Sequence, residues 1–252
     1  MKKFYGLIIY KLALSFLVVI CCTLGASQCS AFAETRLKPL QTVAVTDSGN
    51  AGKASLYAQG QNYKTDVKLT VEFKNHKPYD IRLQDGYSQA IYTFDFGAQD
   101  KFLFYSSQTG GSGGYGNYRI YRLQTETYKL LYDDKTDSKN AVFKTEFIPN
   151  GFMKIYNEAS HSGLDVYVNY MDKSFYDEIF APDGSVKNQT PYVNGISFVS
   201  PSLNSSSGIW RLLTYRSVTA VAEVNRLGYI VQTLDYENGT FTPTFTEFCI
   251  DF

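Results

Sequence analysis

The sequence has no charge excess of either sign. Its 252 residues include 24 Lys and Arg, 24 Asp and Glu, and only two His. A protein that binds nucleic acid through bulk electrostatics needs a clear basic excess, so we expect no nucleic-acid partner. The hydrophobic content of 44% is too high for a disordered chain. The length allows one large domain or two small ones, with room for an apolar core.

The sequence also lacks an apolar run of the about 20 residues that a membrane-spanning helix needs. The apolar run at residues 12–24 is shorter, follows a lysine-rich start and precedes a small-residue site that ends at Ala33. This order is typical of a secretory signal peptide at residues 1–33, cleaved between Ala33 and Glu34. We therefore expect an exported protein, secreted or associated with the cell surface, with no stable membrane insertion after cleavage. An uncleaved membrane anchor is the alternative.

Cysteine is scarce outside this leader, where only Cys249 remains. A single cysteine cannot form an internal disulfide, so the stability of the exported chain must come from its apolar core. Cys249 lies in an apolar C-terminal segment and is expected to pack as a small hydrophobic residue.

Helical periodicity is weak, and only residues 175–180 and 218–224 are expected to form short helices. Strand patterns fill the rest of the chain. Apolar and polar residues alternate over 67–73, and the apolar run at 102–105 predicts a strand buried on both faces. Asn238-Gly239, between two such segments, is the strongest hairpin signal.

These patterns predict an all-β domain, an antiparallel meander of short strands in a propeller-like array, with a β-sandwich as the alternative. The expected organisation is a leader at 1–33, a flexible lead-in at 34–52 and the all-β domain at 53–252. Residues 100–134 and 208–243 share an order of strand, loop, strand, turn and strand. This weak internal repeat favours stacked antiparallel units.

The glycine-rich segment after residue 109 matches both the nucleophile elbow and the dinucleotide-binding loop. Both motifs need a helix directly after the loop, whereas residues 117–123 alternate with the period of a strand. A loop between two strands is therefore expected, and no catalytic residue is assigned. Because glycines allow a ligand to approach the backbone closely, the candidate ligand-binding residues are Gly110, Gly111, Ser112, Gly113, Gly114 and Tyr115.

Metal-binding patterns are incomplete. His76 and His161 lie in polar turns without other ligands at metal-binding spacing, so a zinc site is not expected. The closest candidates for calcium ligands are Asp95 and Asp100, but their segment lacks the acid content of a calcium loop. No metal and no other cofactor is therefore expected. A Ser-His-Asp triad from Ser112, His161 and an Asp would have to be assembled in space.

The stretch YTFDFGAQDKFLFYSSQTGGSGGYGNYRIYRL resembles a segment of exported Gram-positive proteins labelled VCBS or FG-GAP repeat-containing. Thr109 to Gly114 (TGGSGG) carries the resemblance, which extends by pattern over about residues 80–250. It implies a propeller-like β fold and no particular activity. It also implies calcium loops near Asp95–Asp100 and Asn204–Gly208, although this chain lacks most of their acids.

Aromatic residues are abundant, with 21 Tyr and 18 Phe. Most Phe are expected in the core, whereas exposed Tyr can stack on sugars or bind a partner. The expected role is an exported, non-catalytic binding or structural module of the cell surface or medium, its partner an envelope protein or glycan. The alternatives are an envelope-acting hydrolase and a degenerate calcium-dependent adhesive module.

Overall fold

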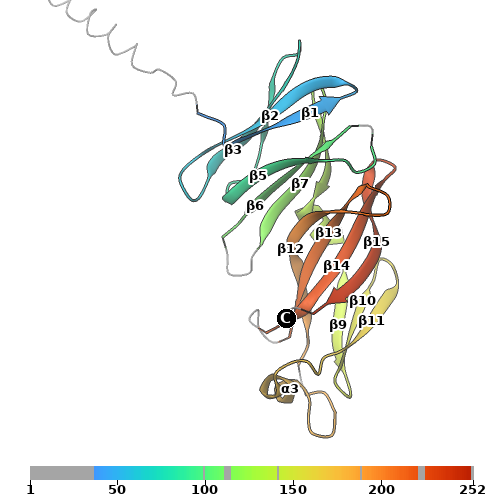
Figure 1. The fold of residues 1–252 in the computed structure, drawn as a ribbon. Coiled ribbons are helices and arrows are strands. Elements are labelled where there is room, and N and C mark those ends of the chain that lie inside the picture. The colour runs from blue at the N-terminus through green and yellow to red at the C-terminus, as the bar shows by residue number, and fades with distance from the viewer. Residues whose placement is uncertain are drawn as a thin grey trace, which may run out of the picture. The chain divides into compact units, whose positions relative to one another are not determined.

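The computed structural model describes residues 37–98, 100–110, 115–140, 142–187, 189–220 and 225–250. Their fold is all-β, with four antiparallel sheets in which neighbouring strands follow one another along the chain (Figure 1). The predicted antiparallel meander is thus confirmed. The leader and its expected cleavage site at Ala33 and Glu34 lie outside the described residues.

The sheets divide the chain in sequence order. The first sheet contains β1 (Gln41–Asp47), β2 (Asn50–Gln59), β3 (Thr65–Phe73) and β4 (Tyr79–Arg82). The second contains β5 (Tyr87–Phe94), β6 (Phe102–Gln108), β7 (Gly116–Leu123) and β8 (Tyr128–Asp133). A three-stranded sheet contains β9 (Phe143–Ile148), β10 (Phe152–Asn157) and β11 (Ser162–Tyr167). The last contains β12 (Tyr192–Leu203), β13 (Trp210–Thr219), β14 (Arg226–Glu237) and β15 (Thr240–Cys249).

The second sheet is buried on both faces, as the apolar run at 102–105 predicts. Leu103 and Tyr105 of β6 join the core shared with the first sheet. Phe102 and Phe104 point to the opposite face and join the core shared with the last sheet. The four-stranded meanders therefore pack face to face in a sandwich-like arrangement, and the described strands do not close into a barrel.

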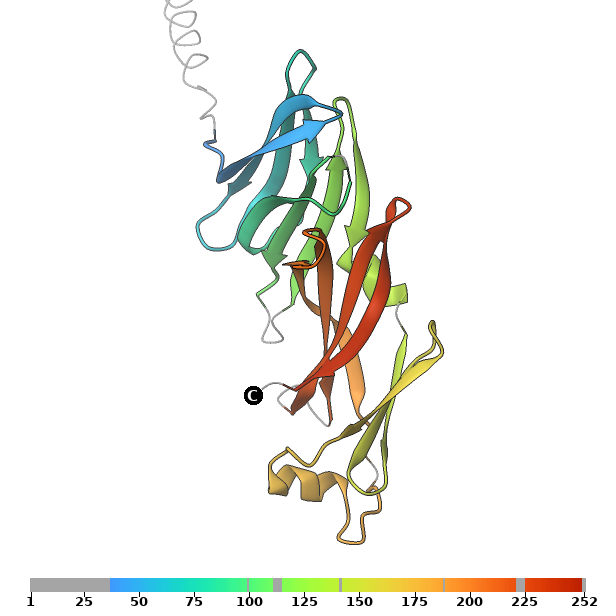
Figure 2. The same ribbon diagram turned by 45° about the vertical axis from the view of Figure 1, so that its right-hand side comes forward.

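The internal repeat corresponds to a repeat of topology. The first copy forms β6, β7 and β8, and the second forms β13, β14 and β15. Each set supplies the last three strands of a four-stranded sheet. The predicted Asn238-Gly239 hairpin joins β14 to β15, which form the red end of the chain in Figure 2. Both turn residues have positive φ, of 51° and 86°.

The lead-in expected at 34–52 is corrected from Gln41 onward, where the chain forms β1 and enters β2. Ser48 and Gly49 both have positive φ and make a two-residue turn, with Asp47 and Asn50 as partners across the hairpin. Val45 is buried in the core of the first sheet. Val43 and Val45 alternate with Thr42, Ala44 and Thr46, so the strand pattern is present but short, and the polar residues and glycines that follow it favoured a loop.

The helical predictions are right at one place and wrong at another. Helix α3 (Lys173–Ile179) overlaps the expected segment 175–180. The other expected helix begins instead as strand, because Val218 and Thr219 end β13 and pair with β14. Residues 221–224 lie outside the description.

Helix α2 (Asp134–Asn140) has no counterpart in the predictions. The Asp133 carboxylate accepts hydrogen bonds from the backbone N–H groups of Lys135 and Thr136, as an N-cap residue does. Helices α2 and α3 have seven residues each. In the part of the chain that the structure describes, no helix is both long and apolar enough to span a membrane.

The outer edge of β5 is capped by the side chain of Gln41. Its Nε2 donates to the Ile91 carbonyl at 2.5 Å, and the Ile91 N–H donates to its Oε1 at 2.9 Å. This amide therefore makes the two hydrogen bonds that a neighbouring strand would make, and it protects an edge that is otherwise open to strand addition.

Replacing Gln41 with alanine is expected to lower the free energy of unfolding by about 1–3 kcal/mol, because the Ile91 backbone groups lose both partners. Denaturant unfolding measures the change. Gln59→Ala, at the exposed end of β2, is the matched control and should have little effect. Equal effects of the two substitutions would show that the Gln41 contacts contribute nothing.

Candidate functional site

An uncharged groove of about 460 Å³ lies between the second and the last sheet. It is formed by β5, β6 and β7 on one side and by β12 and β13 on the other. Its described lining is aromatic and hydroxylic: Ser88, Tyr92, Phe94, Phe104, Ser106, Ser107, Gln108, Tyr118, Phe198, Val199, Ser200, Pro201 and Trp210. We refer to it as the aromatic groove.

The rings of the aromatic groove pack against one another across the two sheets. The Phe94 and Trp210 ring centroids are 4.7 Å apart, and the backbone N–H of Trp210 donates to the backbone carbonyl of Asp95 at 3.0 Å. Tyr118 contacts Phe198 edge-on, with ring centroids 5.9 Å apart. Strands distant in the chain are thus joined into one pre-formed surface, which limits the ordering cost of binding.

Two rings of this groove remain half-exposed. Tyr92 is 48% and Phe198 is 49% exposed, whereas Phe104 and Tyr118 are buried. Side chains that expose this much apolar area beside a hollow are typical of a binding surface.

The polar groups of the groove are hydroxyls and an amide. The Ser107 hydroxyl accepts a hydrogen bond from the Asn117 amide at 3.0 Å, which fixes its position. Burial, and to a smaller extent the negative charge of Asp134, raises the pKa of Tyr118 to about 12. Its phenol therefore stays protonated at neutral pH. Burial also raises the pKa of Asp134, whose carboxylate accepts the Tyr118 N–H.

The predicted glycine-rich segment begins at the end of this groove. Strands β6 and β7 flank it, which confirms a loop between strands rather than a loop before a helix. Gly110 has φ of +85°, and a Cβ added there would lie 2.3 Å from Cε2 of Tyr87. The Thr109 N–H and hydroxyl both donate to the Tyr115 carbonyl, at 2.9 and 2.8 Å. The other four candidates, Gly111, Ser112, Gly113 and Gly114, lie outside the described residues.

The aromatic residues of the groove were not among the predicted site residues. The sequence signal was the abundance of Tyr and Phe, and it could not show which rings remain exposed. The half-exposed rings, Tyr92 and Phe198, come from β5 and β12, so only the packing of the second sheet on the last brings them together.

The two calcium candidates serve structural contacts instead. Asp95 Oδ1 accepts the Gly97 N–H at 2.9 Å. Asp100 is 4% exposed, accepts the Ser48 N–H at 2.9 Å and pairs with Arg122 at 3.2 Å. In the described ranges, no three His, Cys, Asp or Glu residues are grouped as metal ligands.

The histidines and the cysteine lie away from the groove. Nδ1 of His76 lies 3.8 Å from Oε1 of Glu126. His161 occupies a turn with φ of 53°, and its Nδ1 lies 3.2 Å from the Tyr156 hydroxyl. Cys249 is half-buried, and burial raises the pKa of its thiol, which makes it a poor nucleophile.

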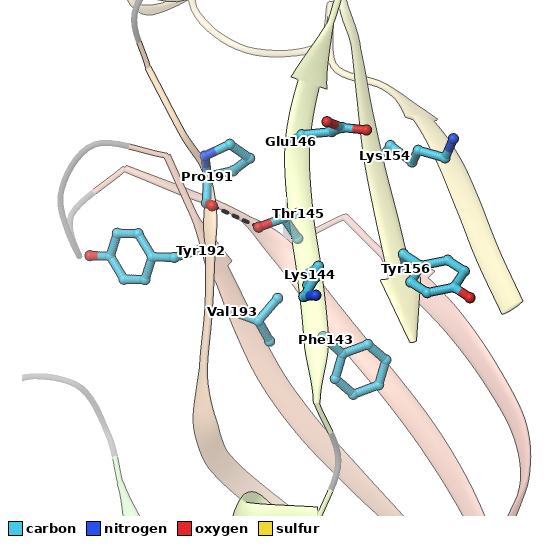
Figure 3. A pocket seen from close by; sticks show the side chains of 9 residues that line it. All are labelled: Phe143, Lys144, Thr145, Glu146, Lys154, Tyr156, Pro191, Tyr192 and Val193. Atoms are coloured by element: carbon cyan, nitrogen blue, oxygen red, sulfur yellow. Dashed lines mark hydrogen bonds between the residues drawn. The ribbon is translucent and has the colours of Figure 1, made fainter. Parts of the chain in front are cut away.

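A second cavity, of about 600 Å³, lies beside β9, β10 and the start of β12 (Figure 3). The Thr145 hydroxyl donates to the Pro191 carbonyl at 2.6 Å and ties β9 to the segment before β12. Lys144 pairs with Glu158, and Glu146 and Lys154 are register partners on β9 and β10, so the lining of this cavity is charged and offers fewer aromatic rings than the aromatic groove. We therefore favour the aromatic groove as the candidate site.

Comparison with known proteins finds similarity at the level of a family model. No curated protein and no solved structure matches the chain. A family model described as the YybI C-terminal domain matches residues 141–249, which contain β9 to β15. The aromatic groove thus lies where the matched segment packs on the preceding sheet, and ligand sites are common at such junctions. Over residues 141–249 the chain is similar to the YybI C-terminal domain family.

Proposed function

We propose that this protein is an exported, non-catalytic binding module of the cell surface or medium, and that its aromatic groove binds a neutral glycan. The observation that carries the proposal is the pair of half-exposed rings, Tyr92 and Phe198, in a groove with hydroxyl groups and no charged residue in its described lining. Export rests on the signal-peptide pattern of residues 1–33.

The chemistry of the lining matches that of a sugar chain. A sugar ring presents an apolar C–H face and a rim of hydroxyls. Aromatic rings supply apolar area for the face, and Ser88, Ser106 and Gln108 supply hydrogen-bonding groups for the rim. A charged ligand would lose its hydration in the groove without gaining an opposite charge, which disfavours ionic partners.

A binding role is proposed rather than glycoside hydrolysis because the described lining lacks the residues that hydrolysis needs. Glycoside hydrolysis uses two carboxylates on either side of the scissile bond. The described lining holds no Asp, Glu or His. The nearby Asp134 accepts the Tyr118 N–H and is buried.

Intrinsic fluorescence offers a direct test, because Trp210 is the only tryptophan of the chain and lines the groove. Titration of the purified protein with neutral envelope oligosaccharides should change its emission saturably, with matching heat in calorimetry. Tyr92→Ala and Phe198→Ala should each weaken binding about tenfold or more, as central aromatic anchors do.

Matched controls are available at equally exposed rings outside the groove. Tyr167→Ala on β11 and Phe245→Ala on β15 should leave the affinity unchanged. Absence of saturable binding, or equal effects of groove and control variants, would refute the proposal. Shortened sugar products would identify a hydrolase instead, and binding that disappears with a calcium chelator would identify the adhesive alternative.

A further inference from the structure

A third hollow, of about 440 Å³, lies at the start of β5. It combines amides, one lysine, one aliphatic residue and a ring: Leu40, Gln61, Asn62, Lys64, Tyr87, Ser88 and Gln89. We refer to it as the β5 hollow. Ser88 lines both this hollow and the aromatic groove, so the two border the same residue.

The backbone at this shared residue has an unusual conformation. The pairing of β5 with β6 shifts register between Tyr87 and Ala90, where two residues of β5 face one residue of β6. Ser88, inside this bulge, has φ of 48°, a backbone conformation that residues other than Gly rarely adopt. Bulges and strained residues of this kind concentrate at functional sites, because they re-aim side chains.

Apart from Lys64, the β5 hollow offers the same kinds of group as the aromatic groove. Tyr87 is 38% exposed, and the half-exposed Tyr63 contacts its ring edge-on, with centroids 5.0 Å apart. Gln61 and Asn62 add side-chain amides that can donate and accept hydrogen bonds. The Lys64 ammonium is engaged with the Gly60 carbonyl at 2.8 Å.

The walls of the β5 hollow are held in place by hydrogen bonds. Lys64 and Gly86 exchange both backbone hydrogen bonds, at 2.8 and 3.0 Å, and so join the β2–β3 turn to the start of β5. The Tyr105 hydroxyl donates to Oε1 of Gln89 at 2.6 Å. Gly110 lies against the Tyr87 ring, where no side chain would fit. The hollow is therefore pre-organised for a ligand.

We infer that the aromatic groove and the β5 hollow are two subsites of one elongated site, and that its ligand is a neutral oligosaccharide whose chain passes Ser88. The inference rests on the proposed function, and it adds that the ligand is long enough to occupy both subsites. Rings at both ends, with hydroxyls and amides between them, suit a polymer of repeated sugar units. A ligand that engages both subsites gains affinity because its second contact is intramolecular.

The test is the dependence of affinity on chain length, with a neutral oligosaccharide series from disaccharide to octasaccharide. Trp210 fluorescence should report binding of every member that fills the aromatic groove, and affinity should rise about tenfold or more once the chain reaches the β5 hollow. Tyr87→Ala and Gln61→Ala should weaken binding of long chains and leave that of short chains unchanged. Tyr167→Ala is the control and should alter neither, and thermal melting checks that each variant is folded.

The possible failures are distinguishable. Affinity that does not depend on chain length, or full affinity for long chains in folded Tyr87→Ala protein, would overturn the second subsite and leave the proposed function intact. Absence of fluorescence change and heat with every oligosaccharide would overturn the proposed function itself.

Discussion

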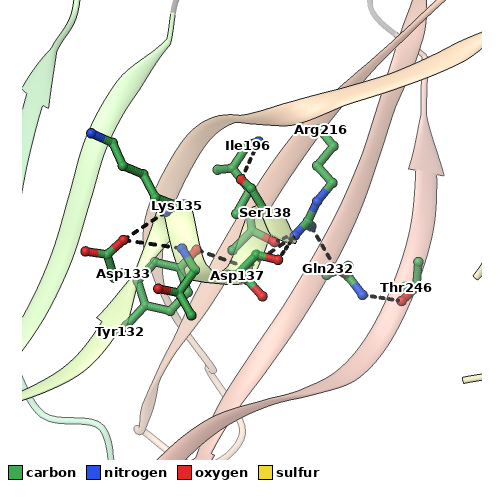
Figure 4. A network of polar contacts seen from close by, with 11 residues as sticks. Tyr132, Asp133, Lys135, Asp137, Ser138, Ile196, Arg216, Gln232 and Thr246 are labelled. Carbon is green, nitrogen blue, oxygen red and sulfur yellow. Dashed lines mark hydrogen bonds and ion pairs between the residues drawn. The ribbon is translucent and has the colours of Figure 1, made fainter. Parts of the chain in front are cut away.

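Replacing Asp137 with alanine is expected to lower the free energy of unfolding by about 3–5 kcal/mol, because it leaves a buried arginine without its carboxylate. Arg216 of β13 is 1% exposed, and its guanidinium lies 3.3 Å from Oδ2 of Asp137 on α2 (Figure 4). A guanidinium cannot lose its proton in a protein, so a charge stripped of its partner stays charged inside the core.

The ion pair is the centre of a larger network. Arg216 also donates to Oε1 of Gln232 at 2.7 Å and to the Asp137 carbonyl at 3.4 Å, and it lies over the Phe143 ring. The Tyr132 hydroxyl donates to the same Asp137 carboxylate at 3.2 Å. Because Tyr132 belongs to β8 and Arg216 to β13, loss of the Asp137 carboxylate removes side-chain contacts of α2 to the sheets on both sides.

The matched control is Lys135→Ala, which removes an exposed side chain from the same helix and keeps the backbone hydrogen bond to Asp133. Its effect should stay within about 0.5 kcal/mol, as is usual for surface positions. The double variant Arg216→Met with Asp137→Leu should be more stable than Asp137→Ala, because it removes both charges and leaves none buried alone. Chemical denaturation measures the free energy of unfolding of each variant. An Asp137→Ala protein as stable as the control would contradict the predicted role of the ion pair.

Replacing Phe102 with alanine is expected to cost about 3–5 kcal/mol as well, through lost burial and a residual cavity. The ring is 0% exposed, lies 6.0 Å from that of Phe96 and meets Tyr236 of the last sheet edge-on at 4.8 Å. It therefore contributes to the contact between two sheets as well as to its own strand.

The same substitution at an exposed ring, Phe245→Ala on β15, should change the stability by less than about 0.5 kcal/mol. Unfolding of the Phe102→Ala protein should remain a single transition when followed by Trp210 fluorescence and by circular dichroism, because the second sheet shares a core with each neighbour. Two separated transitions would show that the sheets fold independently, and equal costs for both phenylalanines would contradict the burial argument for Phe102.

Local chemistry explains which predictions succeed. The turn at Asn238-Gly239 needs two residues with positive φ, a requirement visible in two letters of sequence. The run at 102–105 is apolar on both faces of a strand, so its position inside the stack follows from the alternation of side chains. Helix α2 escaped prediction because its sequence, DKTDSKN, contains no apolar residue and therefore no helical periodicity. Only in the structure does Asp133 cap the helix.

The sequence by itself determined the all-β class, the hairpin turns and the double burial of β6, because each depends on residues within a few positions of one another. Tertiary structure alone decided the partners of Asp100 and Arg216 and the place of Tyr92 beside Phe198. These contacts join strands that lie far apart in the chain, and a strand's own alternation says which face is buried but not what covers it. The position of Ser88 beside both groove and hollow depends on a bulge, and a bulge has no signature in the hydrophobic pattern.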